Sequence, residues 1–257
     1  MEIIIWLTFE IIFFTVHFFL SLIPISNPIG RVAVTLYSQV FVNVLAIYIF
    51  RRHLCKTDAI PLFKRKNLKC VLWTAIIGVG VCLGHRILFL VFWNFTVQSL
   101  EEISQVVANQ SQALFMNSIL GILYTSFLAP ITEEIFFHGI IFNTARKKHS
   151  NLYAIIISSL LFAIGHMNGI QFISGMFMGI VIGCAIILTD NVYIGIIIHV
   201  ANNAFSLINA NLLNSIWGQE YWQVYVQMFV GIIMLVIGFF MLWRENINKY
   251  PNGKVSA

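Results

Sequence analysis

Charged residues are scarce in this chain of 257 residues: Asp, Glu, Lys and Arg make up 10%, whereas 59% of the residues are hydrophobic. Soluble domains carry about 25% charged residues, so this composition excludes a protein whose whole surface faces water. Stretches of about 20 apolar residues, which are long enough to cross a bilayer, fill nearly the whole sequence. We therefore expect residues 1–257 to form a single integral membrane domain without a soluble module.

Cysteine pairs and a cleavable leader are also missing. The four cysteines form no Cys-x-x-Cys pair and no Cys/His metal pattern, so a disulfide framework is not expected. The N-terminus lacks the basic stretch of a signal peptide, since Glu2 is acidic, and its apolar run is too long for one. We interpret this run as the first spanning helix.

The apolar runs predict an all-α, polytopic membrane protein with about eight transmembrane helices. Polar or charged breaks separate the runs, so each break is interpreted as a loop or turn. The approximate spans are 3–23, 29–50, 70–95, 113–143, 152–167, 170–188, 192–213 and 222–243.

Basic residues are absent from two predicted loops, around 99–112 and 214–221. Cytoplasmic loops collect Lys and Arg, so we predict a multi-pass protein of the cell membrane with both termini in the cytoplasm. The basic clusters indicate topology and not nucleic-acid binding, although the loop 51–69 could also attract anionic lipid headgroups. If the spans alternate, 13 of the 15 basic residues lie on the cytoplasmic side: Arg51, Arg52, Lys56, Lys64, Arg65, Lys66, Lys69, Arg146, Lys147, Lys148, Arg244, Lys249 and Lys254.

Ionisable side chains inside the spans are the clearest candidates for function. Inserting one at the bilayer centre costs roughly 2.5–3.5 kcal/mol, so each needs a reason to be there. The first half contains Glu10, His17, His85 and Arg86, to which the sequence assigns no role. The second half contains a denser set, which consists of Glu133, Glu134, His138, His166 and His199, accompanied by Asn202 and Asn203.

Helical spacing indicates which of these side chains share a face. Glu134 and His138 are four residues apart, as are Phe162 and His166, and His199 and Asn203, so each pair lies on one side of its helix. Glu133 lies about 100° around the helix from Glu134, which suggests different tasks for the two carboxylates. Pro130 frees a backbone carbonyl in the preceding turn.

Helical geometry places the ionisable residues of the second half at a similar depth in the membrane. At about 1.5 Å per residue, Glu133 lies about 15 Å, His199 about 10 Å and His166 about 21 Å from the inner ends of their spans. All three can meet in the middle of a hydrocarbon core about 30 Å thick. We therefore predict one site, in the inner half, with access from the cytoplasmic side. From the residues alone, a catalytic site remains open beside a structural or transport role.

Three motifs in the second half resemble those of a known family. They are Glu133-Glu134-x-x-x-His138, Phe162-x-x-x-His166 and His199-x-x-x-Asn203, in this order on successive helices. This arrangement is similar to the CAAX protease and bacteriocin-processing family, also called the Abi family or type II CAAX prenyl endopeptidases. The resemblance covers residues 113–205. Residues 1–112 then form N-terminal helices of unassigned role, and residues 206–257 a C-terminal helix and cytoplasmic tail. The first motif of the family ends in Arg, where this chain has His138.

The resemblance implies a glutamate-dependent intramembrane peptidase acting on a hydrophobic or lipidated peptide. Glu133 would activate a water molecule and His166 would help to hold it. His199 and Asn203 would donate hydrogen bonds to the oxyanion. Glu134, His138, Phe162 and Asn202 would support the site, and no cofactor is implied.

Other readings stay open at this stage. Two His and a Glu could supply three zinc ligands, but there is no His-Glu-x-x-His helix and the resemblance favours a metal-free site. With His138 in place of Arg, the chain could instead bind a peptide without cutting it, as a bacteriocin self-immunity protein. A proton-coupled transporter ranks last, because no inverted repeat is evident. The sequence leaves the peptide, the physiological role and the oligomeric state undetermined.

Overall fold

The computed structural model describes residues 1–54, 67–85, 88, 118–166, 169–208 and 221–247. Within these ranges all regular elements are helices, as predicted, and no strand occurs. Five helices are long and apolar enough to cross a membrane, and three shorter apolar helices accompany them. The expectation of an all-α polytopic membrane protein with about eight membrane helices is confirmed.

The helix boundaries follow the predicted spans within a few residues at most ends. One difference bears on the site: the predicted span 152–167 ends as a helix at Ile164, so His166 lies beyond the helix. The segments in chain order are α1 (Glu2–Ser21), α2 (Pro28–Leu54), α3 (Leu68–Gly84), α7 (Ile119–Leu123), η1 (Tyr124–Leu128), α8 (Ala129–Phe136), η2 (Phe137–Phe142), α9 (Asn143–Arg146), α10 (Asn151–Ile164), α11 (Gly169–Thr189), α12 (Val192–Ile208) and α14 (Tyr221–Ile247).

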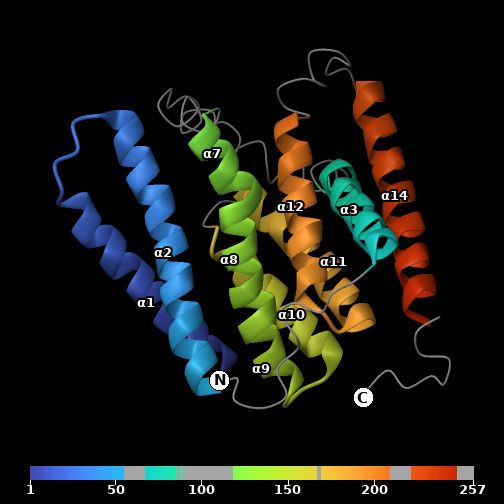
Figure 1. Ribbon diagram of the computed structural model, residues 1–257, viewed down its shortest axis with the longest axis horizontal. Coiled ribbons are helices and arrows are strands. Elements are labelled where there is room, and N and C mark those ends of the chain that lie inside the picture. The colour runs from blue at the N-terminus through green and yellow to red at the C-terminus, as the bar shows by residue number, and fades with distance from the viewer. Residues whose placement is uncertain (55–66, 86–87, 89–117, 167–168, 209–220, 248–257) are drawn as a thin grey trace.

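The helices stand side by side as a bundle with three parts (Figure 1). The pair α1 and α2 flanks one side, and the antiparallel pair α3 and α14 flanks the other. Between them stand α12 and the continuous helical stretch from α7 to α9, with the pair α10 and α11 behind. Helix α12 contacts α3, α8 and α11, which makes it the centre of the bundle.

The two ends of the bundle differ in charge. At one end, called the basic end here, α9 finishes with Arg146 and α14 carries Arg244 in its last turn. Arg146 donates to Asp190 in the turn before α12 (2.9 Å), which ties two helix connections together at this end. At the other end, called the mouth end here, α2 and α7 begin and α12 finishes, at the top of Figure 1.

Glycines let several helices approach closely. Helix α11 carries glycines at every fourth position, Gly175, Gly179 and Gly183, and this stripe faces α10: a Cβ on Gly179 would lie 2.8 Å from Ser159, and one on Gly183 would lie 3.0 Å from Ile155. The stripe therefore serves helix contact, in keeping with the role of small residues in membrane helix packing. Gly78 brings α3 against the backbone of α12 at Ile198, next to His199.

Candidate active site

The glutamate pair lies on an eight-residue α-helix between two π-helical segments. Pro130 has no N–H, so it cannot donate to the carbonyl one turn earlier. The backbone accommodates this in η1, where the Ala129 N–H reaches back five residues to the Tyr124 carbonyl. The second π-helical segment, η2, begins directly after α8 and contains His138. Such segments often occur at functional sites, and here they set how Glu133, Glu134 and His138 face their neighbours.

The Glu134 carboxylate is held between two imidazoles in the interior. His199 Nδ1–H donates to Glu134 Oε1 at 2.8 Å, and His138 Nδ1 lies 2.8 Å from Glu134 Oε2. The second contact has the length of an ion pair, but its geometry does not satisfy a hydrogen bond. The Glu134 and His138 side chains are 0% exposed. Gly195, one turn before His199, permits this approach, because a Cβ there would lie 3.0 Å from Glu134 Oε2.

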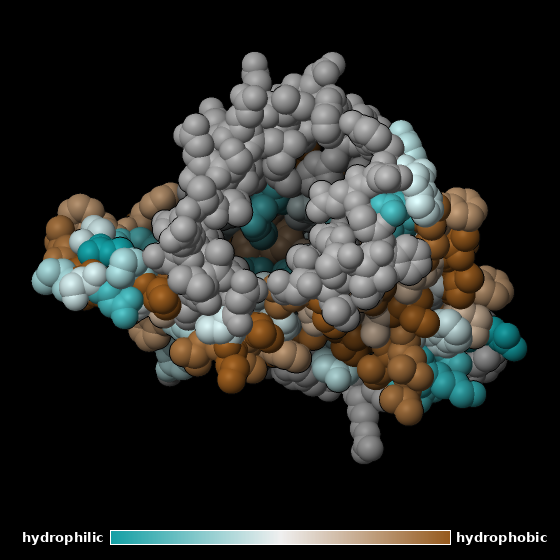
Figure 2. Space-filling model, turned by 90° about the horizontal axis from the view of Figure 1, so that it is seen from above, coloured by the Kyte–Doolittle hydropathy of each residue, from teal (hydrophilic) through white to brown (hydrophobic). Residues whose placement is uncertain are grey.

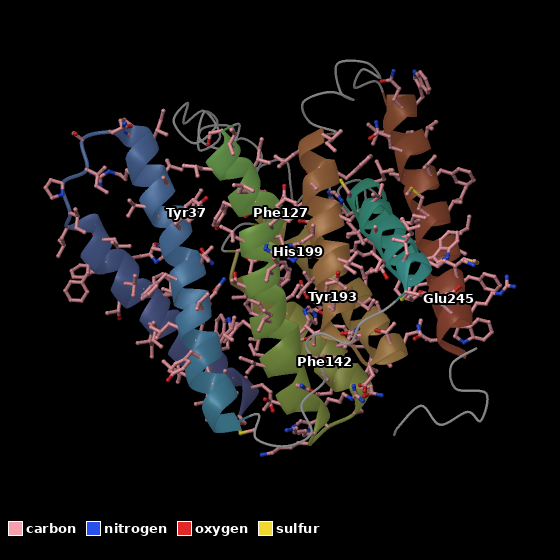
Figure 3. All side chains as sticks on the ribbon, in the orientation of Figure 1. Tyr37, Phe127, Phe142, Tyr193, His199 and Glu245 are labelled. Atoms are coloured by element: carbon pink, nitrogen blue, oxygen red, sulfur yellow. The ribbon has the colours of Figure 1, made fainter. Side chains whose placement is uncertain are left out.

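The other edge of the His199 ring faces Glu133. His199 Nε2 lies 3.9 Å from Glu133 Oε2, too far for a direct hydrogen bond. Since Nδ1 carries the proton given to Glu134, neutral His199 presents a lone pair at Nε2. It can donate from Nε2 only when both ring nitrogens are protonated. His199 lies between two carboxylates near the middle of the bundle (Figure 3).

His166 presents an acceptor to the same space. Its Nδ1 is 2.9 Å from the Phe162 carbonyl, and a carbonyl can only accept, so Nδ1 carries the proton. In the neutral ring, Nε2 then keeps its lone pair. The Phe162 ring stands edge-on to both His166 and His199, with centroid distances of 4.8 and 5.7 Å. Phe162 therefore orients the two imidazoles, although His166 lies past the end of α10.

The asparagine pair supplies donors. Asn203 Nδ2 donates one hydrogen to the Thr125 carbonyl of η1 (2.9 Å), which leaves its second hydrogen available. Asn202 Nδ2 donates to Asn203 Oδ1 (2.9 Å) and fixes the orientation of that amide. The link to Thr125 joins the third motif to the π-helical segment before the first motif, a contact that sequence spacing did not reveal.

Most of the predicted site residues line one cavity of about 500 Å³. Glu133, Phe162, His166, His199, Asn202 and Asn203 form part of its wall, whereas Glu134 and His138 are buried behind His199. Helices of the first half complete the wall with Phe9, Leu36, Gln39, Val81 and His85. Seen from the mouth end, hydrophilic side chains of the described residues are visible near the centre of the molecule (Figure 2).

One buried contact beside the first motif could not be found from the motif spacing. Asn43 of α2 is 1% exposed and donates to Thr132 Oγ1 at 3.1 Å. Thr132 directly precedes Glu133, so this contact braces α8 against α2 at the site. A lone Asn within the apolar run 29–50 was the signal that could have identified it.

The ionisable residues of the first half lie in different environments. Glu10 is buried beside Gly165, which precedes His166. His17 Nδ1 lies 2.9 Å from the Phe13 carbonyl, and Ser38 Oγ lies 3.2 Å from the other ring nitrogen. His85 lines the cavity, and Arg86 lies outside the described residues.

A metal site has little support in the geometry. In the part of the chain that the structure describes, no three His, Cys, Asp or Glu side chains are grouped so that they could hold a metal ion. His199 uses Nδ1 for Glu134 and His166 uses Nδ1 for a carbonyl, so each would have only Nε2 to offer.

Comparison with known proteins gives one match. No curated protein and no solved structure matches the chain. A family model described as "Type II CAAX prenyl endopeptidase Rce1-like" matches residues 115–205, which contain all three motifs. This is a family of proteases, as the motif resemblance predicted. The segment 115–205 is therefore similar to the Rce1-like members of the type II CAAX prenyl endopeptidase family, and it lies within a polytopic membrane protein.

Proposed function

We propose that the protein is an intramembrane endopeptidase in which Glu133 activates a water molecule to hydrolyse a hydrophobic or lipidated peptide. The observation that carries this proposal is the arrangement of Glu133, His166, His199 and Asn203 on the wall of one cavity. The Glu134 carboxylate behind them fixes one of the imidazoles at 2.8 Å. A peptidase needs a base, a polarised water and donors for an oxyanion, and these side chains can supply all three.

The proposed reaction starts with a water held between Glu133 and His166 Nε2. Glu133 takes one proton from the water while its oxygen attacks the peptide carbonyl carbon. The carbonyl oxygen becomes an oxyanion, and the free hydrogen of the Asn203 amide and a protonated His199 Nε2 donate to it. Glu133 then passes its proton to the leaving nitrogen as the C–N bond breaks. The products are a carboxylic acid and an amine, and Glu133 returns to its starting form.

Glu134 and His138 act behind the reacting atoms in this scheme. By accepting a hydrogen bond from the Nδ1–H group, Glu134 orients His199 and favours the doubly protonated ring that the oxyanion requires. His138 contacts the other oxygen of the same carboxylate. Where the family has Arg, this chain therefore offers a weaker partner that lacks the guanidinium fork.

The test is cleavage of a quenched fluorogenic lipopeptide library by purified protein in detergent, with and without a chelator. We expect cleavage to persist in chelator and to fall at least about 10³-fold in Glu133→Gln and Glu133→Ala. The control is Glu245→Gln, which removes a carboxylate on α14 that bonds Asn67. Activity lost on chelation would instead indicate a metalloprotease. Peptide binding without any cleavage would indicate a non-catalytic immunity protein.

A further inference from the structure

Thr132, Glu133 and Glu134 follow one another on α8 and point in three directions. Thr132 faces α2, where its Oγ1 accepts a hydrogen bond from Asn43 Nδ2 at 3.1 Å. Glu133 lines the cavity, and Glu134 faces α12, where its Oε1 accepts from His199 Nδ1 at 2.8 Å. Successive side chains of a helix are about 100° apart. The contacts on either side of Glu133 therefore bear on where its carboxylate points.

The Glu133 carboxylate itself has no close anchor. It makes no hydrogen bond to another described residue, and its ion-pair contact with His199 Nε2 spans 3.9 Å. The Glu134 carboxylate, by contrast, has two contacts at 2.8 Å. The direction of Glu133 therefore depends on the rotation of α8 about its own axis.

Side-chain contacts are important for this rotation because π-helical segments adjoin both ends of α8. The regular hydrogen-bond pattern of the α-helix is interrupted in η1 and in η2. Helix α2 stands beside α8 (Figure 1), and the Asn43–Thr132 hydrogen bond joins the two. One turn further along the same face of α8, the Phe136 ring packs against Phe9 of α1, with a centroid distance of 4.5 Å. The pair α1 and α2 thus holds one face of α8.

Thr132 connects the Asn43 amide to the backbone at the start of α8. Its hydroxyl hydrogen is shared between the Leu128 and Ala129 carbonyls, at 2.9 and 3.1 Å, while its oxygen accepts from Asn43. Asn43 is 1% exposed, so lipid and water do not compete for this contact. The chain of hydrogen bonds therefore attaches the first turn of α8, directly before Glu133, to α2.

We propose that Asn43 is a positioning residue for the catalytic base: through Thr132 it fixes the rotation of α8 and directs Glu133 toward the reacting water. The role of Glu133 rests on the proposed function. Its carboxylate lies about 5–6 Å from the helix axis, so a rotation of about 10° displaces it by about 1 Å. A misplacement of that size can lower a rate by about 10²-fold. Helix α2, which lies outside residues 115–205, then takes part in catalysis.

The first test compares turnover in wild type and in Asn43→Leu. Leu has a similar size, and no buried hydrogen is left unpaired, because the Thr132 hydroxyl still donates to its carbonyls. We expect a nearly unchanged thermal midpoint, a kcat for the fluorogenic peptide at least about tenfold lower, and a KM changed by less than about twofold. The matched control is Asn246→Leu, the same replacement at a buried Asn of α14, which should keep the wild-type kcat.

Changes at Thr132 show whether the effect runs through its hydroxyl. Thr132→Ser keeps the hydroxyl and should retain most of kcat, whereas Thr132→Val should lower kcat at least as much as Asn43→Leu. The double variant Asn43→Leu with Thr132→Val should lose no more than Thr132→Val alone, since both changes act on one contact. A wild-type kcat in Asn43→Leu, or losses that multiply in the double variant, would overturn the proposal.

The second test follows residue 133 without any peptide. In a background in which the four cysteines are replaced by Ala, Glu133→Cys carries a trifluoromethyl label for fluorine NMR in detergent. We expect a single resonance that splits or broadens when Asn43→Leu is added, and that stays single with Asn246→Leu. Identical spectra would refute the positioning role. Absence of cleavage by the wild type would refute the peptidase, while the spectra would still decide whether Asn43 fixes α8.

Discussion

Replacement of Glu134 by Gln isolates the charge behind His199. Gln has nearly the same size and keeps an oxygen that can accept a hydrogen bond from the His199 Nδ1–H group. It loses the negative charge that faces both imidazoles at 2.8 Å. A hydrogen bond to a charged group contributes about 1.5–3 kcal/mol, against about 1 kcal/mol for a neutral one. The loss of about 0.5–2 kcal/mol of oxyanion stabilisation corresponds to a decrease in kcat of about 2–30-fold.

The decrease is expected in kcat and not in KM, because Glu134 is 0% exposed and does not line the cavity. Steady-state kinetics with the fluorogenic peptide measures both parameters. Glu134→Ala removes the acceptor as well, so kcat should fall by about 10²–10³-fold, and thermal unfolding should show a less stable protein. If Glu134→Gln kept the wild-type kcat, or changed only KM, the role of Glu134 in orienting His199 would be wrong.

Three further changes probe the support around the site. His138→Arg gives Glu134 a permanently charged partner, so kcat measured with the fluorogenic peptide should rise several-fold; an unchanged kcat would show that the partner is not limiting. Thr132→Val removes the partner of Asn43 and should lower the free energy of unfolding by about 1–3 kcal/mol, a loss that the double variant with Asn43→Leu should partly restore in denaturant titrations. Gly78→Ala forces a methyl group against the backbone of α12 and should cost about 1–3 kcal/mol, whereas Gly84→Ala, whose Cβ would meet nothing closer than 3.5 Å, should leave the thermal midpoint nearly unchanged.

The fold was largely predictable because the bilayer restricts it. Each spanning segment must satisfy its own backbone in an apolar medium, so runs such as 3–23 and 222–243 could only become helices, seen as α1 and α14. The glycine stripe of α11 was also readable, since small residues at every fourth position mark a helix contact. Such patterns are local, because each can be recognised within the sequence of a single helix.

The contacts between helices were harder to predict from the sequence. Order and spacing suggested that Glu133, His166 and His199 could meet, but not that His199 would lie between two carboxylates. That arrangement depends on Gly195, which leaves room for the Glu134 carboxylate. The π-helical segment η2 changes the angular position of His138 relative to Glu134 by an amount that regular helical spacing does not contain. The Asn43–Thr132 contact depends on how α2 is placed beside α8, which periodicity does not determine.

The early end of α10 has a consequence for the lipid around the protein. Its 14 residues span about 21 Å, roughly 9 Å less than a typical hydrocarbon core. When α10 starts at one membrane interface, its end at Ile164 therefore lies within the hydrocarbon, short of the opposite interface. A short span is accommodated by hydrophobic mismatch, in which the surrounding leaflet thins. The hydrocarbon layer is therefore expected to be thinner beside α10 than beside the full-length helices of the bundle, which shortens the path of a peptide through the lipid to His166.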